Sequence, residues 1–582
     1  MTVALKSGFK KRLRINFSSL LDSEALHPLL QRIFNNRNVS HPEDLELSLS
    51  KLHSPNQLKD IEKACALLKH VIARNGRILI VGDYDTDGAT ASAVAVLGLK
   101  SLGAEKVDYL VPNRFDYGYG LSLAIAKVAL VKSPDLVVTV DNGISSLEGI
   151  SFLREAGVEV LVTDHHLAGN ELPQASAIIN PNQPRCNFPS KMLAGVGVMF
   201  YLLLALRSFL KDSGWFEKRK KEPPNLAMLL DLVALGTVAD VVPLDHNNRI
   251  LVAQGIARIH QGRCRPGIKA LLAVAGKDHA GISSADLGFV VAPRLNAAGR
   301  LDDISMGIEC LLTDNEKQAQ EYAAILHEMN LERRQIELQM QKQAIDVVDS
   351  LNDQGVENGI CLYREDWHQG ITGLVASRVR ERFFQPAIVF ARSSDGRLTG
   401  SARSIVGLHI RDLIEEIERS HPGLIDKFGG HAMAAGLTIS ETKLEQFSAL
   451  FHAAVSAHFA CHSPADLIYS DGPLEPEFFT QQIAELLKNA APWGQGFSPP
   501  VFDNEFKVVG QKVVGEQHLK LRLATRGRVL DGIAFRQLQP GENAPSLDKI
   551  HAAFQLDINE FRGAKSLQLI IEYMEPAEST SS

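Results

Sequence analysis

The sequence predicts an α/β protein with two α/β domains and a C-terminal β-barrel. Between residues 77 and 163, short β-branched runs alternate with helical segments, which is typical of a parallel sheet covered by helices on both faces. From Thr313, apolar residues recur at helical spacing for about 35 residues, and so long a helix more often joins two bodies than lies inside one. Beyond residue 463, five alternating runs with polar turns predict a small barrel of the oligonucleotide-binding type.

These patterns divide the 582 residues into six parts. They are an N-terminal segment (1–50), a first α/β domain (51–312), a connecting helix (313–350), a second α/β domain (351–462), the barrel (463–575) and a tail expected to be disordered (576–582). The first domain should contain strands at 77–81, 107–111, 136–140 and 158–163. The second should contain strands within 359–366, 386–390 and 397–403, and the barrel at 506–509, 518–523, 529–535, 552–558 and 567–573.

Composition narrows the class of protein. With 45% hydrophobic and 22% charged residues, the chain is a globular protein and not a disordered one. The net charge of −7 provides no general attraction for an anionic polymer, so any contact with nucleic acid requires a local basic track. Six scattered cysteines without a CxxC pair argue against a zinc finger or a disulfide framework. Without a secretory signal or a long apolar run, the sequence predicts a cytoplasmic protein with no membrane stage.

Acidic residues and histidines follow three of the expected strands. The carboxyl ends of parallel strands share one edge of a sheet, so these side chains should lie together, where like charges need cations to coexist. A single aspartate at a strand end more often caps the next helix, but three such strand ends together favour a shared site. The residues are Asp83, Asp85, Asp87, Asp141, Asp164, His165 and His166.

The donor set indicates the metal and the chemistry. Mixed carboxylate and imidazole ligands suit Mn²⁺ or Mg²⁺ better than Zn²⁺. The number of donors suggests two divalent cations, a pair that favours in-line displacement at phosphorus and hence phosphoester hydrolysis. Asp240 lies among apolar residues, and a partly buried carboxylate needs a partner or a metal, so we include it in the candidate site.

These residues carry a family resemblance. The segments GDYDTDGATA (82–91), VDNGIS (140–145), TDHH (163–166) and GTVADVVPL (236–244) resemble the four motifs of the DHH phosphoesterase superfamily. The stretches at 292–301, 367–379, 400–404 and 428–436 are similar to the bacterial single-strand-specific exonucleases of that superfamily. The resemblance covers roughly residues 50 to 440 and implies a parallel-sheet DHH domain, a DHH-associated substrate-binding domain and a following OB-like barrel.

The resemblance assigns roles to the acidic cluster. It implies that Asp87, Asp141, His165 and Asp240 hold one cation and that Asp83 and Asp85 hold the other, with Asp87 or Asp141 bridging the two. It implies that His166 contacts the scissile phosphate or orients the nucleophile, and that Asp164 supports the ligands. Asp83 is either a direct ligand or a supporting residue, because many relatives have a histidine near this position.

A second set of residues has the chemistry of a phosphate holder. Ser401 and Arg403, which we expect on a short turn, pair a hydroxyl with a guanidinium, a combination that binds phosphate by charge-assisted hydrogen bonds. His431 follows two glycines, which let backbone approach a ligand closely. The resemblance places all three in the substrate-binding domain.

Two further stretches are candidates for contacts with a nucleic-acid strand. Arg294, Asn296 and Arg300 lie on a stretch with small residues between them, which we expect to be loop-like and to face a strand's backbone. Arg114 is interleaved with aromatic residues that include Tyr119, as platforms for stacking bases require. The resemblance implies that Arg114 holds a 5′ phosphate.

The resemblance implies a single-stranded-DNA-specific 5′-to-3′ exonuclease that releases 5′-mononucleotides by two-metal hydrolysis in DNA recombination and repair. It implies action with a helicase and a single-strand-binding protein. We also expect the protein to be a monomer. One alternative is a DHH phosphodiesterase for oligoribonucleotides, cyclic dinucleotides or phosphoadenosine phosphate, but such relatives are generally shorter and lack the barrel. Another is a non-catalytic scaffold, against which the intact acidic set argues.

Overall fold

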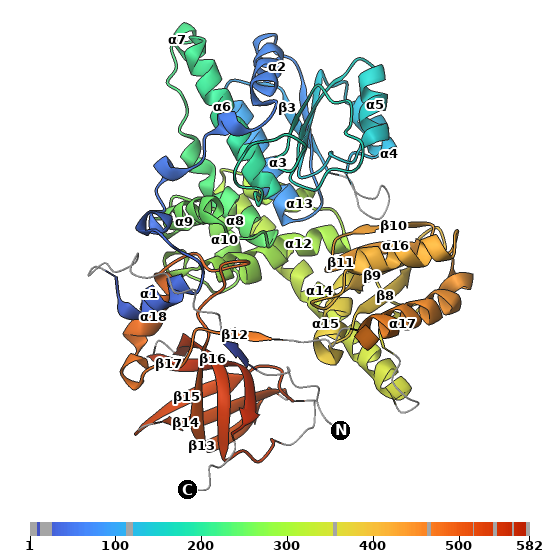
Figure 1. Ribbon diagram of the computed structural model, residues 1–582. Coiled ribbons are helices and arrows are strands. Elements are labelled where there is room, and N and C mark those ends of the chain that lie inside the picture. Colours follow the sequence, from blue (N-terminus) through green and yellow to red (C-terminus); the bar gives the residue numbers. More distant parts are fainter. Residues whose placement is uncertain are drawn as a thin grey trace. The chain divides into compact units, whose positions relative to one another are not determined.

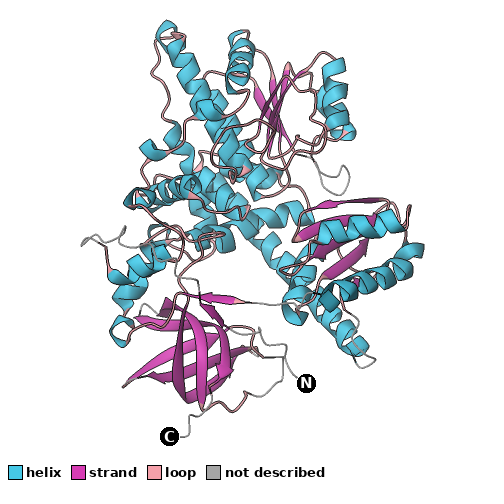
Figure 2. Cartoon of the chain, in the orientation of Figure 1, coloured by secondary structure: helices cyan, strands magenta, loops and turns pink. Residues whose placement is uncertain are grey.

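The computed structural model describes residues 9–11, 26–111, 120–352, 358–461, 467–515, 517–525, 527–538, 544–561 and 564–577. Their main parts are two five-stranded α/β sheets and a closed five-stranded barrel (Figures 1 and 2). No helix in these ranges is long and apolar enough to cross a bilayer.

The first sheet is entirely parallel, in the order β3-β2-β4-β5-β6. Its strands are β2 (Ile78–Val81), β3 (Val107–Leu110), β4 (Leu136–Val140), β5 (Glu159–Thr163) and β6 (Ala177–Ile179). Every residue of β2 and β4 is buried, which explains their unbroken apolar character, since a parallel sheet is covered on both faces. The four strands expected here are confirmed, whereas β6 is too short to produce a sequence pattern.

Helices pack on this sheet (Figure 1). Residues of α4 (Leu123–Val131) and α5 (Leu147–Glu155) form one core with alternate strand residues such as Leu79 and Val137, while α3 (Thr86–Ser101) and α6 (Gly195–Asp212) also contact the strands. The other helices of this region are α2 (Ile61–Ala73), α7 (Trp215–Lys218), α8 (Leu230–Ala239), α9 (His246–His260), α10 (Pro266–Ala273), α11 (Ser284–Asp286), α12 (Ala292–Leu301) and α13 (Ser305–Leu312).

Helix α12 corrects one expectation. The stretch with Arg294, Asn296 and Arg300 is helical and not loop-like, and a π-helical turn, Leu287–Val291, precedes it. Ala292, Ala297 and Ala298 are buried, so the small residues that suggested a loop instead allow close packing of a helix.

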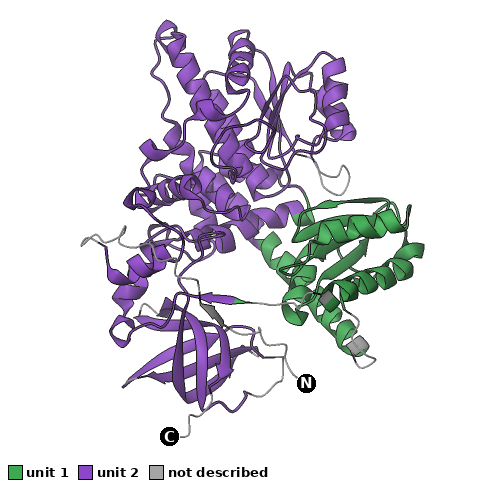
Figure 3. Cartoon of the chain, viewed as in Figure 1, with its two compact units in different colours: residues 1–8, 300–302, 328–467 green, residues 9–299, 303–327, 468–582 purple. Residues whose placement is uncertain are grey.

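The long helix is confirmed as α14 (Glu316–Asn352), with 37 residues. The chain forms two compact units, and the boundary between them falls inside α14, after His327 (Figure 3). Residues 300–302 and 328–467 belong to one unit, and residues 9–299, 303–327 and 468–582 to the other. We call these the substrate-domain unit and the catalytic unit.

The sheet of the substrate-domain unit is mixed, in the order β10-β11-β9-β8-β7, with only β7 and β8 parallel. Its elements are β7 (Ile360–Tyr363), α15 (Thr372–Phe383), β8 (Ala387–Arg392), β9 (Leu398–Arg403), α16 (Ile410–Ser420), β10 (Lys427–Gly430), β11 (Ala434–Ile439) and α17 (Leu444–Cys461). The strand expected within 397–403 is confirmed as β9. The turn expected at Ser401 and Arg403 is therefore wrong, because both residues lie on this strand. Strand β9 alternates buried and partly exposed residues, the pattern of a strand with one face on the core.

The C-terminal strands form a closed barrel in the order β13-β14-β15-β17-β16, as predicted. They are β13 (Phe502–Val514), β14 (His518–Thr525), β15 (Arg528–Ala534), β16 (Lys549–Phe561) and β17 (Ala564–Pro576). Phe502, Phe506 and Phe554 are fully or almost fully buried, and Phe554 contacts the other two rings edge-on or at a tilt, so aromatic packing fills this end of the barrel.

The barrel shares its core with other parts of the catalytic unit. One apolar cluster contains Phe34 of α1 (Pro28–Asn35), Leu244 just before α9, Val252 of α9, Leu487 of α18 (Gln481–Asn489) and Phe554 of the barrel. In addition, β1 (Phe9–Lys11) pairs with β12 (Ile468–Ser470). Removing the barrel would therefore expose apolar side chains of the catalytic unit.

Candidate metal centre

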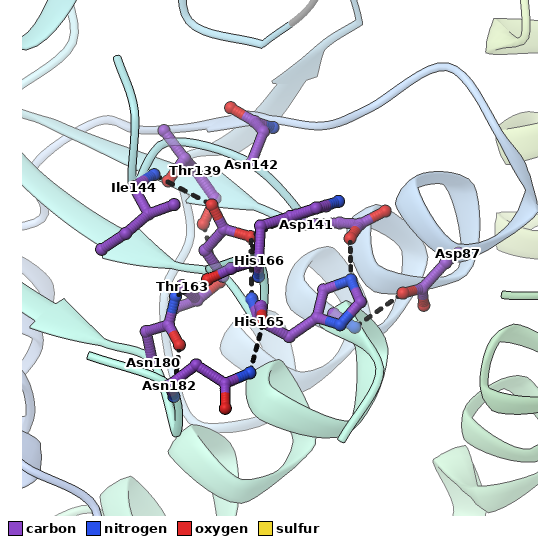
Figure 4. Close-up of polar contacts among 12 residues, drawn as sticks. Asp87, Thr139, Asp141, Asn142, Ile144, Thr163, His165, His166, Asn180 and Asn182 are labelled. Atoms are coloured by element: carbon purple, nitrogen blue, oxygen red, sulfur yellow. Dashed lines mark hydrogen bonds and ion pairs between the residues drawn. The ribbon is translucent and has the colours of Figure 1, made fainter. Parts of the chain in front are cut away.

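The acidic residues meet at the carboxyl edge of the parallel sheet. Asp83, Asp85 and Asp87 occupy the turn after β2 and the start of α3, and Asp141 follows β4 directly. His165 follows β5, and its imidazole points toward the carboxylate of Asp141 (Figure 4). The topology predicted from the sequence thus brings these side chains together.

His165 lies at the middle of the cluster. Its Nε2 is 3.1 Å from Asp141 Oδ1 and 3.4 Å from Asp240 Oδ2, although Asp240 comes from the end of α8. Three groups each bring three potential ligand atoms within 4.8 Å of one another, and Asp141 and His165 belong to two groups each. The groups are Asp87, His165 and Asp240; Asp83, Asp85 and Asp141; and Asp141, His165 and His166.

Backbone donors orient Asp87. The amides of Gly195 and Val196, at the start of α6, donate to its two carboxylate oxygens at 2.6 and 3.0 Å. A Cβ on Gly195 would lie 2.5 Å from the Cβ of Asp141, so only glycine allows α6 to approach this closely. The sequence analysis missed this support, and its one local signal was the pair of glycines in AGVGVMF (194–200).

Asp164 organises the loop that carries both histidines. Its Oδ1 accepts from the amides of His165 and His166 at 2.7 and 3.1 Å, and lies 2.8 Å from His166 Nδ1. Its Oδ2 accepts from the amide of Ile144 at 2.9 Å. All four contacts hold the loop in place, which suits the supporting role that we expected for this residue.

Two asparagines missed by the sequence analysis also hold this loop. The side-chain amides of Asn180 and Asn182 donate to the carbonyls of His166 and His165 at 2.9 and 2.6 Å (Figure 4). Both follow β6, the strand that was too short to predict. The only signal in the sequence was their spacing in INPN (179–182).

The electrostatics of the cluster favour cations. Burial, together with the neighbouring Asp85, raises the pKa of Asp87 to about 7. Burial and the surrounding carboxylates also raise the pKa values of Asp141 and Asp240 well above the ordinary value. Burial also acts to raise the pKa of Asp164 and is the largest single influence on it. The hydrogen bonds from His166 and the Ile144 amide and the charges of the two histidines together outweigh burial, so the net shift is downward. The cluster is therefore an assembly of carboxylates that are difficult to charge together without bound positive charge.

The side chains fit hard divalent cations. The donors are carboxylate oxygens and imidazole nitrogens without a thiolate, which suits Mn²⁺ or Mg²⁺. Asp240 Oδ2 is buried and, among the described residues, has no donor in hydrogen-bond geometry. A buried carboxylate oxygen in this state is stabilised by coordination to a cation.

The predicted strand-binding residues of α12 are more buried than expected. Asn296 Oδ1 accepts from the amide and the hydroxyl of Thr86 at 2.8 and 2.9 Å, so it holds the turn that precedes Asp87. Arg294 is 6% exposed, and its guanidinium donates to Val290 O and to His327 Nδ1. These contacts support packing within the catalytic unit, and a role in DNA contact stays a prediction for both residues.

In the substrate-domain unit, Ser401 and Arg403 lie two residues apart on β9 and hence on one face of the sheet. Ser401 Oγ is 2.9 Å from Thr372 Oγ1 at the start of α15. Burial lowers the pKa of Arg403, and the charge of Arg380 lowers it further, so an anion would stabilise this guanidinium.

The other residues predicted to bind substrate do not lie on β9. In the same unit, Arg300 Nη1 donates to Gly370 O at 3.2 Å. His431 lies exposed in the turn between β10 and β11. Arg114 and Tyr119 lie outside the described residues.

Comparison with known proteins identifies the family. Three family profiles match the chain: the DHH family N-terminal domain over residues 77–237, the DHHA1 domain over 357–457 and the RecJ OB domain over 470–573. Over 558 residues the chain is 50% identical to the single-stranded-DNA-specific exonuclease RecJ of Escherichia coli strain K12, a match that covers 95% of this chain and 96% of that protein. The chain belongs to the RecJ family. The fold predicted from the sequence is thereby confirmed in its DHH, DHHA1 and OB parts.

Solved RecJ structures match as well. RecJ from Thermus thermophilus in complex with Mn²⁺ has a TM-score of 0.78 at 29% identity, over 95% of this chain and 76% of that chain. The same RecJ in complex with Mg²⁺ has a TM-score of 0.72 at 27% identity, over 95% and 75% of the two chains. The cations in these RecJ structures are the two that the donor set of this chain favours.

Proposed function

We propose that this chain is a single-stranded-DNA-specific 5′-to-3′ exonuclease that releases 5′-mononucleotides and acts in DNA recombination and repair. The observation that carries the proposal is the set of carboxylates and histidines from four separate segments, gathered at one sheet edge in a member of the RecJ family. In this proposal Asp87, His165 and Asp240 hold one cation and Asp83 and Asp85 the other, with Asp141 shared.

The ligand residues and their neighbours divide the chemistry. When bound, the two divalent cations activate water and neutralise charge that develops at the phosphorus. His166 is oriented by Asp164 at Nδ1, so a contact with a phosphate oxygen would use Nε2. Burial, the largest single influence, acts to lower the pKa of His166. The hydrogen bond to Asp164 and the charges of the surrounding aspartates together outweigh it, so the net shift is upward and favours the protonated, donating form.

Substrate polarity would come from residues outside the metal centre. The Ser401 hydroxyl and the Arg403 guanidinium are the proposed holders of a backbone or terminal phosphate, because together they offer a neutral and a charged donor on one face of β9. Arg114, Tyr119, Arg294, Asn296, Arg300 and His431 are proposed to contribute further DNA contacts. The barrel would hold the strand at a distance from the reacting end.

We propose further that the protein is a cytoplasmic monomer. A helicase would supply unwound ends, and a single-strand-binding protein would deliver or protect the strand. Sedimentation equilibrium tests the monomer, and a pull-down with purified single-strand-binding protein tests that contact.

End-labelled oligonucleotides provide the direct test of activity. We expect the protein with Mn²⁺ to digest a single strand from its 5′ end to mononucleotides, to leave a blunt duplex intact, and to stop when a chelator is added. The matched control is Asp240→Asn, which removes one proposed ligand while preserving side-chain volume. Digestion that begins at the 3′ end, or that continues in chelator, would contradict the proposal.

A further inference from the structure

The turn after Asp240 has an unusual backbone. Asp240 ends α8, and the next residue, Val241, has φ of +59° and is 63% exposed. A β-branched residue is disfavoured in the left-handed region because its Cβ crowds the backbone. Such a conformation persists only where the surroundings hold it in place.

A loop from the barrel side of the chain lies against this turn. The loop comprises Trp493–Phe497, within the residues that match the RecJ OB domain. The amide of Leu244 donates to Gln495 O at 2.7 Å. A Cβ on Gly494 would lie 2.7 Å from Leu244 Cδ1, so a larger residue at this position would have to displace the Leu244 side chain.

The loop is itself firmly anchored. The rings of Trp493 and Phe497 stack with their centroids 5.3 Å apart. The guanidinium of Arg37 lies 5.1 Å from the centroid of the Trp493 ring, and that of Arg249 lies 4.2 Å from the centroid of the Phe497 ring, so both make cation–π contacts. Ser284 Oγ donates to Trp493 O at 2.6 Å. Three separate elements, α9, α11 and the segment after α1, therefore fix the loop in position.

Hydrogen bonds also connect the turn after Asp240 to the backbone segment that orients a second proposed ligand, Asp87. Asn248 is fully buried, and its Nδ2 donates to Pro243 O at 2.9 Å and to Met192 O at 2.6 Å. Met192 shortly precedes Gly195, whose amide donates to Asp87. The turn after Asp240 thus lies between the loop 493–497 and the backbone that orients Asp87.

We propose that the loop Trp493–Phe497 is a positioning element of the metal centre, which holds Asp240 in place through Pro243 and Leu244. The inference rests on the proposed function, in which Asp240 is a cation ligand. It gives the barrel-side residues a role besides contact with DNA. A residue that supports a ligand typically contributes a factor of about 10 to 100 to metal affinity, so a displaced loop should weaken cation binding.

The test measures Mn²⁺ binding to the full-length protein by the electron paramagnetic resonance signal of free Mn²⁺. In Gly494→Val the new side chain must push Leu244 away, and we expect about 10-fold weaker binding of one Mn²⁺. We expect the KM for a short single strand to stay unchanged and the activity to recover at high Mn²⁺. Ser284→Ala, which removes one anchor of the loop, should show a smaller loss in the same direction.

Lys488→Ala is the matched control. Lys488 Nζ donates to Gly281 O at 3.0 Å, so this variant removes another contact between α18 and the preceding part of the catalytic unit without touching the turn at 241–245. We expect its Mn²⁺ binding to equal that of the parent protein. A lower affinity in this control would show that any loosening of the interface weakens binding, and would overturn a specific role for the loop.

The outcomes separate the two proposals. A parent protein that binds no Mn²⁺ contradicts the proposed function itself. A parent that binds two ions, with Gly494→Val and Ser284→Ala binding identically, leaves the proposed function standing and overturns the role of the loop. If Gly494→Val does not fold, as circular dichroism would show, Ser284→Ala decides alone.

Discussion

The metal centre in the catalytic unit and the Ser401–Arg403 face in the substrate-domain unit are electrostatic opposites. In the first, burial and neighbouring carboxylates raise the pKa values of Asp87, Asp141 and Asp240. In the second, burial and a neighbouring cation lower the pKa of Arg403. In each region the like charges are costly to bury together, so bound cations would stabilise the first region and a bound anion the second. This complementarity suits a nuclease that acts on a phosphodiester strand.

The two regions also arise differently. The metal centre depends on topology, because a parallel sheet places the ends of β2, β4 and β5 at one edge although they are far apart in sequence. The Ser401–Arg403 face depends on local geometry, because residues two apart on a strand share a face. The first should therefore be sensitive to changes at several distant positions, and the second mainly to changes on β9 itself.

The largest expected effect is that of Asp141→Ala on hydrolysis. This variant removes a carboxylate that belongs to two of the candidate ligand groups, and we expect a loss of roughly 10³-fold or more in kcat, because cations contribute several kcal/mol to stabilising the transition state. The protein should remain folded, since one source of repulsion is gone. The control is Asp135→Ala, at the opposite edge of the sheet, which should digest single strands normally. Near-normal activity of Asp141→Ala would refute the shared ligand.

The second effect concerns pH and stability in the presence of a chelator. The pKa of Asp87 is about 7 in the folded protein, against an ordinary value of 3.8, so the folded state binds the proton more tightly than the unfolded state. Below about pH 4, protonated Asp87 makes its full contribution to the free energy of unfolding. This contribution decreases by about 1.4 kcal/mol per pH unit as the pH rises toward 7. We expect the Tm of the chelated protein to fall from about pH 5 to about pH 7, and saturating Mn²⁺ to reduce this fall.

Asp141→Asn is the control for this measurement, because it removes one titrating carboxylate while preserving its volume. It should make the decline of the chelated protein's Tm with pH shallower. A decline equally steep in the variant, or unaffected by Mn²⁺, would mean that the acidic cluster does not cause it.

A smaller effect is expected for Arg403→Ala in the substrate-domain unit. A hydrogen bond from a charged group contributes about 1.5–3 kcal/mol, so affinity for a 5′-phosphorylated strand should fall about 10- to 100-fold. The loss should be smaller for a strand with a 5′ hydroxyl, and fluorescence anisotropy with both strands measures the difference. Arg397→Ala is the control, because Arg397 is partly exposed and pairs with Asp395 and Asp426. Equal losses on both strands would place the 5′-phosphate holder elsewhere.

The smallest effect is expected for Ser401→Ala, which removes a neutral hydroxyl that already contacts Thr372. A hydrogen bond of this kind contributes about 0.5–1.5 kcal/mol, so strand affinity should fall about 2- to 10-fold. Ser393→Ala, in the turn before β9, provides a control with a hydroxyl that contacts Asp395. A loss at Ser401 as large as that at Arg403 would show that the hydroxyl and not the charge dominates this face.

Local sequence patterns predicted the structure correctly where a helix or strand is determined by the pattern of its own residues. The β-branched runs predict β2 to β5, the helical spacing predicts α14, and the alternating runs predict all five barrel strands. Predictions from local sequence were wrong where the same residue types are compatible with two kinds of local structure. Small residues in α12 suggested a loop but allow close packing of a helix, and a Ser–Arg pair suggested a turn but continues β9.

The sequence by itself determined the strands, the acidic residues at their ends and the kind of cation that those residues favour. Only the tertiary structure decided that Asp240 lies beside His165, that the amide of Gly195 orients Asp87, and that a loop before the barrel packs on Leu244. The physical reason is the separation along the chain of the residues that interact. Strand pattern and ligand type depend on neighbours along the chain, whereas these contacts join segments far apart in sequence, and only the packing of the whole core selects them.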